Sequence, residues 1–249
     1  WSFVKYDSQN RAVISGITTI AGTAETVAAA LKAHNATLSS TEQVFEERGN
    51  DLHGYTNRCY PTNVTSSQVM NVTYYDDYQW IADTTTYGFS SADALEGMVK
   101  TENNVIGLTT GTKTKIIGIE TDQWLTSVTY YDDYGNAIQT ISDLYPGGTE
   151  IVSNVLDFND QVLQTKVKQT VDNTTYEYNK WFDYDSYGRL LKIRQKITGD
   201  PQNEIVLSEF AYDDLGQLVS KKIHGNLEET TYQYDINTRE IAALSPSFW

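Results

Sequence analysis

The stretch Tyr184-Asp185-Ser186-Tyr187-Gly188-Arg189 is the fullest copy of a short block that recurs along this chain of 249 residues. From Asp132 onward, the block's Asp returns after 25, 28, 28 and 22 residues. A repeat with a period in this range predicts an array of small supersecondary units. The other copies, complete or weakened, are Tyr131-Asp132-Asp133-Tyr134-Gly135-Asn136, Tyr212-Asp213-Asp214-Leu215-Gly216-Gln217, and those that begin at Tyr6, Tyr75, Leu156 and Tyr234.

The block has the composition of a tight turn. Asp at its second position can accept hydrogen bonds from the N–H groups of the turn, and Gly at its fifth can adopt positive φ and close a hairpin with a bulge. Asn10 and Asp160 stand in the Gly position of two copies and are the next most tolerant residues there. The predicted turn residues are Asp7, Asp76, Asp132, Gly135, Asp185, Gly188, Asp213, Gly216 and Asp235.

The residues around each block read as strands. Phe182 and Tyr184 are two residues apart, which places both on one face of an incoming strand. Leu190–Ile193 reads as the returning strand. A lone hairpin is marginally stable, so neighbouring hairpins must pair. The repeat aromatics that we expect to pack between hairpins are Tyr6, Tyr75, Tyr131, Tyr184, Tyr212 and Tyr234.

These patterns predict a mainly β fold: an extended, twisted antiparallel sheet of repeated hairpins with one or two short helices. We divide the chain into a degenerate repeat region with helical insertions, 1–120, and a regular hairpin array, 121–249, and expect one continuous sheet. The distance from Asp76 to Asp132 is 56 residues, or two periods of 28, which predicts a worn copy between them. Ala-rich Thr23–Lys32 predicts a helix, and the capping-box-like spacing of Ser90 and Asp93 predicts another.

Composition excludes several classes of function. The chain has 33 acidic and 18 basic residues, a net charge of −15, which argues against nucleic acid and anionic membranes as partners. It contains no apolar run long enough for a membrane-spanning helix. Aromatic residues make up 12% of the chain, more than acidic disordered chains carry. Cys59 is the single cysteine, so no disulfide framework is possible within the chain.

The serial Tyr-Asp blocks resemble the YD-repeat, or Rhs, family. The preceding region looks like the N-terminal part of large Rhs-type surface proteins from Bacteroidetes-like bacteria. The residues that carry this likeness are Gly107-Leu108-Thr109-Thr110-Gly111-Thr112-Lys113, followed by the stretch from Trp124 to Gly135, and Gly54-Tyr55-Thr56-Asn57 with Tyr60-Pro61.

The resemblance implies a fragment of a longer secreted or cell-surface protein whose sheet spirals into a shell. In many bacterial members such a shell encloses a C-terminal toxin, and an Asp-Pro-rich signature marks the end of its wall. That signature is not found here, since Asp200-Pro201 lies mid-array and reads as an ordinary turn. The partner expected first is therefore the rest of the same chain.

No catalytic constellation stands out. Repeated acidic pairs such as Asp132-Asp133 could bind calcium, but their fixed place in the block favours turn capping. Glu46, Glu47 and Glu120 are glycosidase candidates only because acids are abundant. The three histidines lack metal-ligand spacing. We expect no enzymatic activity, no cofactor and no metal.

Aromatic residues outside the repeat leave a second hypothesis open. Tyrosine and tryptophan on a sheet can stack on sugar rings, although packing explains the repeat tyrosines better. The possible ligand-binding residues are Trp80, Trp124 and Trp181. The favoured function is a structural scaffold. The alternative is a glycan-binding or protein-binding module of the cell surface.

Overall fold

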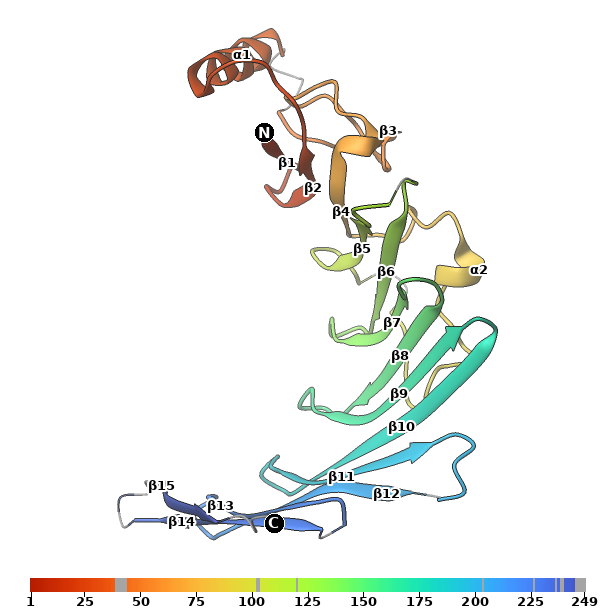
Figure 1. Cartoon of the computed structure of the whole chain (residues 1–249), viewed down its shortest axis with the longest axis vertical. Coiled ribbons are helices and arrows are strands. Elements are labelled where there is room, and N and C mark those ends of the chain that lie inside the picture. The colour runs from red at the N-terminus through yellow and green to blue at the C-terminus, as the bar shows by residue number, and fades with distance from the viewer. Residues whose placement is uncertain are drawn as a thin grey trace. The chain divides into compact units, whose positions relative to one another are not determined.

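The computed structural model describes residues 1–38, 44–101, 104–119, 121–202, 204–225, 227–235, 237 and 240–244. In these residues the protein is mainly β (Figure 1). None of the described helices is long and apolar enough to cross a membrane. The strands of the sheet are β1 (Ser2–Tyr6), β2 (Ala12–Ile17), β4 (Val69–Tyr75), β5 (Thr109–Lys115), β6 (Trp124–Tyr131), β7 (Ala137–Asp143), β8 (Thr149–Leu156), β9 (Val162–Val171), β10 (Thr174–Tyr184), β11 (Leu190–Ile197), β12 (Ile205–Tyr212), β13 (Leu218–Ile223), β14 (Glu228–Tyr234) and β15 (Glu240–Leu244).

The fourteen strands that the described residues form in this sheet are antiparallel and follow one another in the order of the chain. The order begins at β1 and ends at β15 without returning to β1. The elements outside the sheet are α1 (Ala24–Thr37), β3 (Arg48–Leu52), the 3₁₀ turn η1 (Ser66–Gln68) and the single turn α2 (Thr84–Tyr87). The predicted fold class is thus confirmed.

Two compact units make up the chain. The first comprises Trp1–Gly88, Thr101–Tyr130 and Ser142–Tyr145, and the second comprises Phe89–Lys100, Tyr131–Ile141 and Pro146–Trp249. The first unit holds the insertions α1, β3 and η1 between β2 and β4. The second unit holds most of the regular hairpins.

The first unit has a conventional core around β4. Val69 and Val72 are fully buried there, and the Tyr74 ring is stacked on Trp80 with centroids 4.0 Å apart. Tyr55, from the insertion, stacks near Tyr74 at 5.8 Å. Alternate burial along β4 follows from the period of two in a strand.

A buried ion pair fastens the insertion to β1. Lys5 Nζ lies 2.9 Å from Glu46 Oε1, and neither side chain is exposed to solvent. Lys5 also donates to Asn57 Oδ1 and to the carbonyl oxygen of Cys59. Glu46 accepts from Thr56 Oγ1 at 2.6 Å. Because the polar atoms around the pair are hydrogen-bonded, the two charges can remain buried.

The second unit alternates two kinds of turn. The repeat turns between β8 and β9 (Leu156-Asp157) and between β10 and β11 (Tyr184-Asp185) lie on the left in Figure 1, and the β9–β10 connection lies on the right. That connection is the two-residue loop Asp172-Asn173, with φ of 48° and 62°, and Val171 pairs with Thr174. Two successive positive φ values define the type I′ turn that suits the twist of a hairpin.

The helix predicted after Ser90 is wrong. Segment 89–100 contains turns and a bend joined by backbone without regular secondary structure. Asp93 is buried and accepts from Ser90 Oγ at 2.8 Å, while its carboxylate lies 3.3 Å from Lys166 Nζ and 3.1 Å from Lys168 Nζ. The predicted capping side chain therefore binds strand β9, and these tertiary contacts override local helix propensity.

The worn copy predicted between Asp76 and Asp132 is also wrong. β4 pairs with β5, and β5 pairs with β6. The described residues of this stretch therefore contain no extra Tyr-Asp hairpin. The extra length lies in the long connection from β4 to β5 and in the loop from β5 to β6. By contrast, the helix predicted at Thr23–Lys32 is confirmed and extends to Thr37.

Candidate functional site

The Asp of the repeat caps its own turn. Asp185 Oδ1 accepts from the backbone N–H groups of Tyr187 and Arg189, each at 2.9 Å. The same pair of bonds, to the residues two and four positions later, forms in the turns of Asp7, Asp132, Asp157 and Asp213. Asp235 accepts from Asn237 N–H at 2.8 Å. The carboxylates are thus used in forming the turns.

Positive φ marks the position three residues after that Asp. Gly135, Gly188 and Gly216 have φ of 87°, 78° and 83°. Asn10 and Asp160, which replace the Gly, have φ of 62° and 63°. The register between the paired strands shifts at the turn, for example between Asp183 and Tyr184. This geometry is the turn with a bulge that the sequence predicts.

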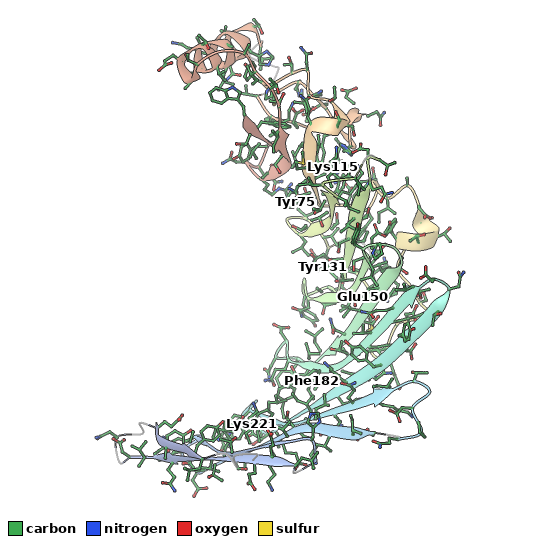
Figure 2. All side chains as sticks on the ribbon, viewed as in Figure 1. Tyr75, Lys115, Tyr131, Glu150, Phe182 and Lys221 are labelled. Atoms are coloured by element: carbon green, nitrogen blue, oxygen red, sulfur yellow. The ribbon has the colours of Figure 1, made fainter. Side chains whose placement is uncertain are left out.

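In four copies of the repeat, the tyrosine joins its hairpin to the one before it. Tyr212 Oη donates to the carbonyl oxygen of Leu190 at 3.1 Å, and Tyr184 Oη donates to that of Val162 at 3.0 Å. Each acceptor is the residue five positions after the Asp of the preceding turn. The same bond joins Tyr234 to Leu218 at 2.8 Å and Tyr75 to Ala12 at 3.2 Å. Figure 2 labels two of the repeat tyrosines, Tyr75 and Tyr131.

A second set of contacts runs forward along the chain. In the turns of Asp132 and Asp157, the residue four positions after the Asp reaches the positive-φ residue of the next turn. Gln161 Nε2 donates to the carbonyl oxygen of Gly188 at 2.7 Å, and Asn136 Nδ2 donates to Asp160 Oδ1 at 2.7 Å. Arg189 places its guanidinium 4.7 Å from the centre of the Tyr212 ring. We call these backward and forward contacts the turn ladder. Its forward half was not predicted from the sequence.

Asp76 does not form a turn of the repeat, which corrects its assignment. Its own φ is 72°, and its carboxylate accepts from Arg11 and from Gly107 N–H at 2.6 Å. The hydrogen bond from Arg11 is the main cause that lowers the pKa of Asp76. Asp77, one residue later, accepts from Gln79 N–H instead. The physical reason is the long connection that follows β4, which opens the turn.

Two of the three candidate ligand-binding tryptophans are used in packing. One face of Trp80 lies against Tyr74, and its indole N–H donates to Thr110 Oγ1 at 3.1 Å. Trp124 packs against the same core, with its ring 4.5 Å from that of His53. Both side chains are nevertheless only half-buried, so a role in ligand binding stays a prediction for them. Trp181 is half-buried on β10, and its role in ligand binding stays a prediction.

The acids considered for glycoside hydrolysis have structural partners where they are described. Glu46 pairs with Lys5, and Glu47 with Arg58. Glu120 lies outside the described residues. Among the described residues, no three His, Cys, Asp or Glu side chains gather in the manner of a metal site.

A cavity lies beside the turns of Asp132 and Asp157, and all the residues that line it belong to the second unit. Its volume is about 620 Å³, within the range of roughly 300–1,000 Å³ that ligand pockets occupy. Segment 89–100 forms one wall through Gly97, Met98 and Val99. The other lining residues are Asp132, Asp133, Tyr134, Asn136, Ile138, Asn154, Val155, Leu156, Asp157, Phe158 and Asp160.

Comparison with known proteins identifies no family. No family model matches the chain, and no curated protein matches it. Among solved structures, the chain is similar to one described as the Tc holotoxin pore of Photorhabdus luminescens, with a TM-score of 0.35 and 15% sequence identity over 98% of this chain. The match spans 12% of the length of that protein. At this TM-score the similarity carries no argument about fold or function.

Proposed function

We propose that the chain is a non-enzymatic scaffold segment of a secreted or cell-surface protein of the Rhs/YD-repeat type. Its hairpins extend a sheet that continues in the rest of a longer polypeptide. In a full-length protein of this type, the sheet would form part of a β-shell around a C-terminal toxin or effector. The partner proposed first is therefore the remainder of its own chain.

The observation that supports this proposal is the turn ladder. Each contact in it joins one turn to its neighbour, as Tyr212 joins Leu190 and Gln161 joins Gly188. Because each contact involves only the neighbouring repeat, the same pattern can be extended by adding further repeats. In repeat proteins, stability is likewise the sum of the repeats and of the interfaces between neighbours. The repeat residues thereby serve assembly of the sheet, and their carboxylates are used in capping.

This proposal can be tested by measuring the length of the native polypeptide and its location in or outside the cell. We would identify the protein from its producing cell by mass spectrometry, before and after protease treatment of intact cells. A product much longer than 249 residues, rich in further Tyr-Asp blocks and accessible to external protease or found in the medium, would support a surface scaffold. A product of about 249 residues inside the cell would contradict it.

A further inference from the structure

The cavity beside the turns of Asp132 and Asp157 combines an apolar interior with an exposed apolar mouth. Ile138, Val155 and Leu156 give it aliphatic walls. At the mouth, Tyr134 is 90% exposed and Phe158 is 94% exposed. Large apolar side chains gathered around a hollow are typical of an interaction site, whereas single exposed ones are ordinary.

The position of Tyr134 and Phe158 matters more than their exposure alone. Tyr187 lies at the tip of the turn of Asp185. It is 84% exposed but does not line the cavity. Val99, the third exposed apolar residue at the mouth, comes from segment 89–100. That segment is fastened by buried Asp93 to Lys166 and Lys168, so this wall of the cavity is held by ion pairs.

The charges of the lining all have one sign. Four aspartates line the cavity, and no lysine or arginine is among its lining residues. Two of the carboxylates, Asp132 and Asp157, are held in place by the N–H groups of their turns. A third, Asp160, accepts from Asn136 at 2.7 Å. Fixed carboxylates beside apolar walls favour a cation over a neutral or anionic ligand.

Aromatic rings at the mouth favour the same occupant. The faces of tyrosine and phenylalanine attract a guanidinium or ammonium group. An arginine side chain also has an aliphatic stem that can lie along apolar walls while its charged end faces the carboxylates. A neutral sugar would use the rings but would gain nothing from the charge.

We propose that this cavity binds an arginine side chain presented by an extended segment of a partner protein. The stem contacts Ile138, Val155 and Leu156, and the guanidinium lies between the aspartates and the rings of Tyr134 and Phe158. The site does not depend on the scaffold function, because all its residues lie in one unit of this chain.

The test is an NMR titration of the whole chain with two peptides, acetyl-Gly-Leu-Arg-Leu-Gly-amide and the same peptide with citrulline in place of arginine. Citrulline keeps the shape and removes the charge. We expect chemical-shift changes confined to the lining residues, affinity for the arginine peptide at least about tenfold higher, and weaker binding as salt increases, since screening weakens exposed charge pairs.

Matched variants separate the site from general effects. Asp160→Asn removes one charge while keeping an acceptor for Asn136 and a residue that tolerates positive φ; Asp172→Asn is the same change at a positive-φ turn that does not line the cavity. Phe158→Ala and Tyr187→Ala form the second pair. We expect the first member of each pair to weaken peptide binding several-fold, and the second to leave it unchanged.

Several outcomes would overturn the proposal. These are equal affinity for the arginine and citrulline peptides, absence of shifts at millimolar peptide, or equal effects of Asp160→Asn and Asp172→Asn. Binding of spermidine without binding of the peptide would assign the site to small amines instead of a protein. Stronger binding of a neutral glycan such as cellopentaose at the same residues would assign it to carbohydrate.

Discussion

The hydroxyl of Tyr212 donates to the carbonyl oxygen of Leu190 at 3.1 Å, across 22 residues of sequence. Leu190 is the first residue of β11, directly after the turn of Asp185. The bond therefore connects the last residue of β12, beside the turn of Asp213, with the residue that follows the turn of the previous hairpin. Because Tyr184 makes the equivalent bond to Val162, the relationship is a property of the repeat.

Removing this hydroxyl should weaken the junction between hairpins. We expect Tyr212→Phe to lower the free energy of unfolding by about 1 kcal/mol, since a typical intramolecular hydrogen bond contributes about that much. Chemical denaturation followed by circular dichroism measures the change. Tyr176→Phe is the control, because Tyr176 is 61% exposed at the start of β10. If both variants unfold at the same denaturant concentration, the bond contributes nothing to stability.

The turn glycine should resist a side chain because of its backbone. Gly188 has φ of 78°, and the left-handed conformation costs an alanine about 1–2 kcal/mol. We expect Gly188→Ala to lower the melting temperature, and Gly188→Asn to lower it less, since Asn10 occupies the same position in another turn.

Gly147→Ala is the matched control for the turn glycine. An added Cβ there would meet nothing within 4 Å, and Gly147 is not among the glycines with positive φ. Its melting temperature should stay near that of the wild type. Equal losses at both glycines would show that positive φ is not what limits substitution at Gly188.

Segment 89–100 should loosen when its anchor is removed. Burial disfavours the charge of Asp93, but hydrogen bonds from Ser90, Lys168 and Lys166 outweigh burial and lower its pKa. We expect Asp93→Ala to increase hydrogen exchange at the Ser90 amide, which donates to Gln139 Oε1 at 2.7 Å. Exchange measured by mass spectrometry on a peptide covering the segment tests this.

Glu96→Ala serves as the comparison for the anchor, because Glu96 is exposed on the same segment. Its exchange should match the wild type. The same region should also loosen in wild-type protein as pH falls through the lowered pKa of Asp93. Unchanged protection of Ser90 in Asp93→Ala would mean that apolar contacts hold the segment.

The sequence was sufficient to predict the features that depend on neighbouring residues. The Asp caps, the positive φ at Gly188 and the strands that flank the turn all follow from residues within a few positions of one another. The repeat period then indicates that the hairpins pair in order. These local rules account for most of the sheet.

Features that join distant residues could not be read in the same way. Gln161 reaches Gly188 across 27 residues, and one sequence gives no reason to connect a glutamine at the sixth position of the block with the next turn. Asp93 matched a helix cap but is bound by Lys168, 75 residues later. Asp76 has the Tyr-Asp letters of the repeat, yet it is bound by Arg11, which lies 65 residues earlier in the chain. In each case a long-range contact decided between local alternatives.

The buried pair of Lys5 and Glu46 should be the most sensitive charged site of the first unit. Both side chains are fully buried, so Glu46→Gln leaves an ammonium without its counter-charge. Loss of one partner of a buried pair costs about 3–5 kcal/mol. We expect a decrease of that size in the free energy of unfolding, measured with denaturant. Glu47→Gln is the adjacent control, because Glu47 is half exposed beside Arg58 and an exposed pair contributes only about 0–1 kcal/mol.

The same pair gives the stability of the first unit a defined pH dependence. Burial opposes ionisation of Glu46, but hydrogen bonds from Lys5 and Thr56 outweigh it, and the pKa of Glu46 is lowered. The unfolded chain therefore binds the proton more readily, so the stabilisation is complete above the unfolded pKa of about 4.3 and is lost as pH falls through the folded value. The double variant Lys5→Met with Glu46→Leu should be less destabilised than Glu46→Gln and should lose less stability between neutral and acid pH. If its acid unfolding follows that of the wild type, other carboxylates determine the transition.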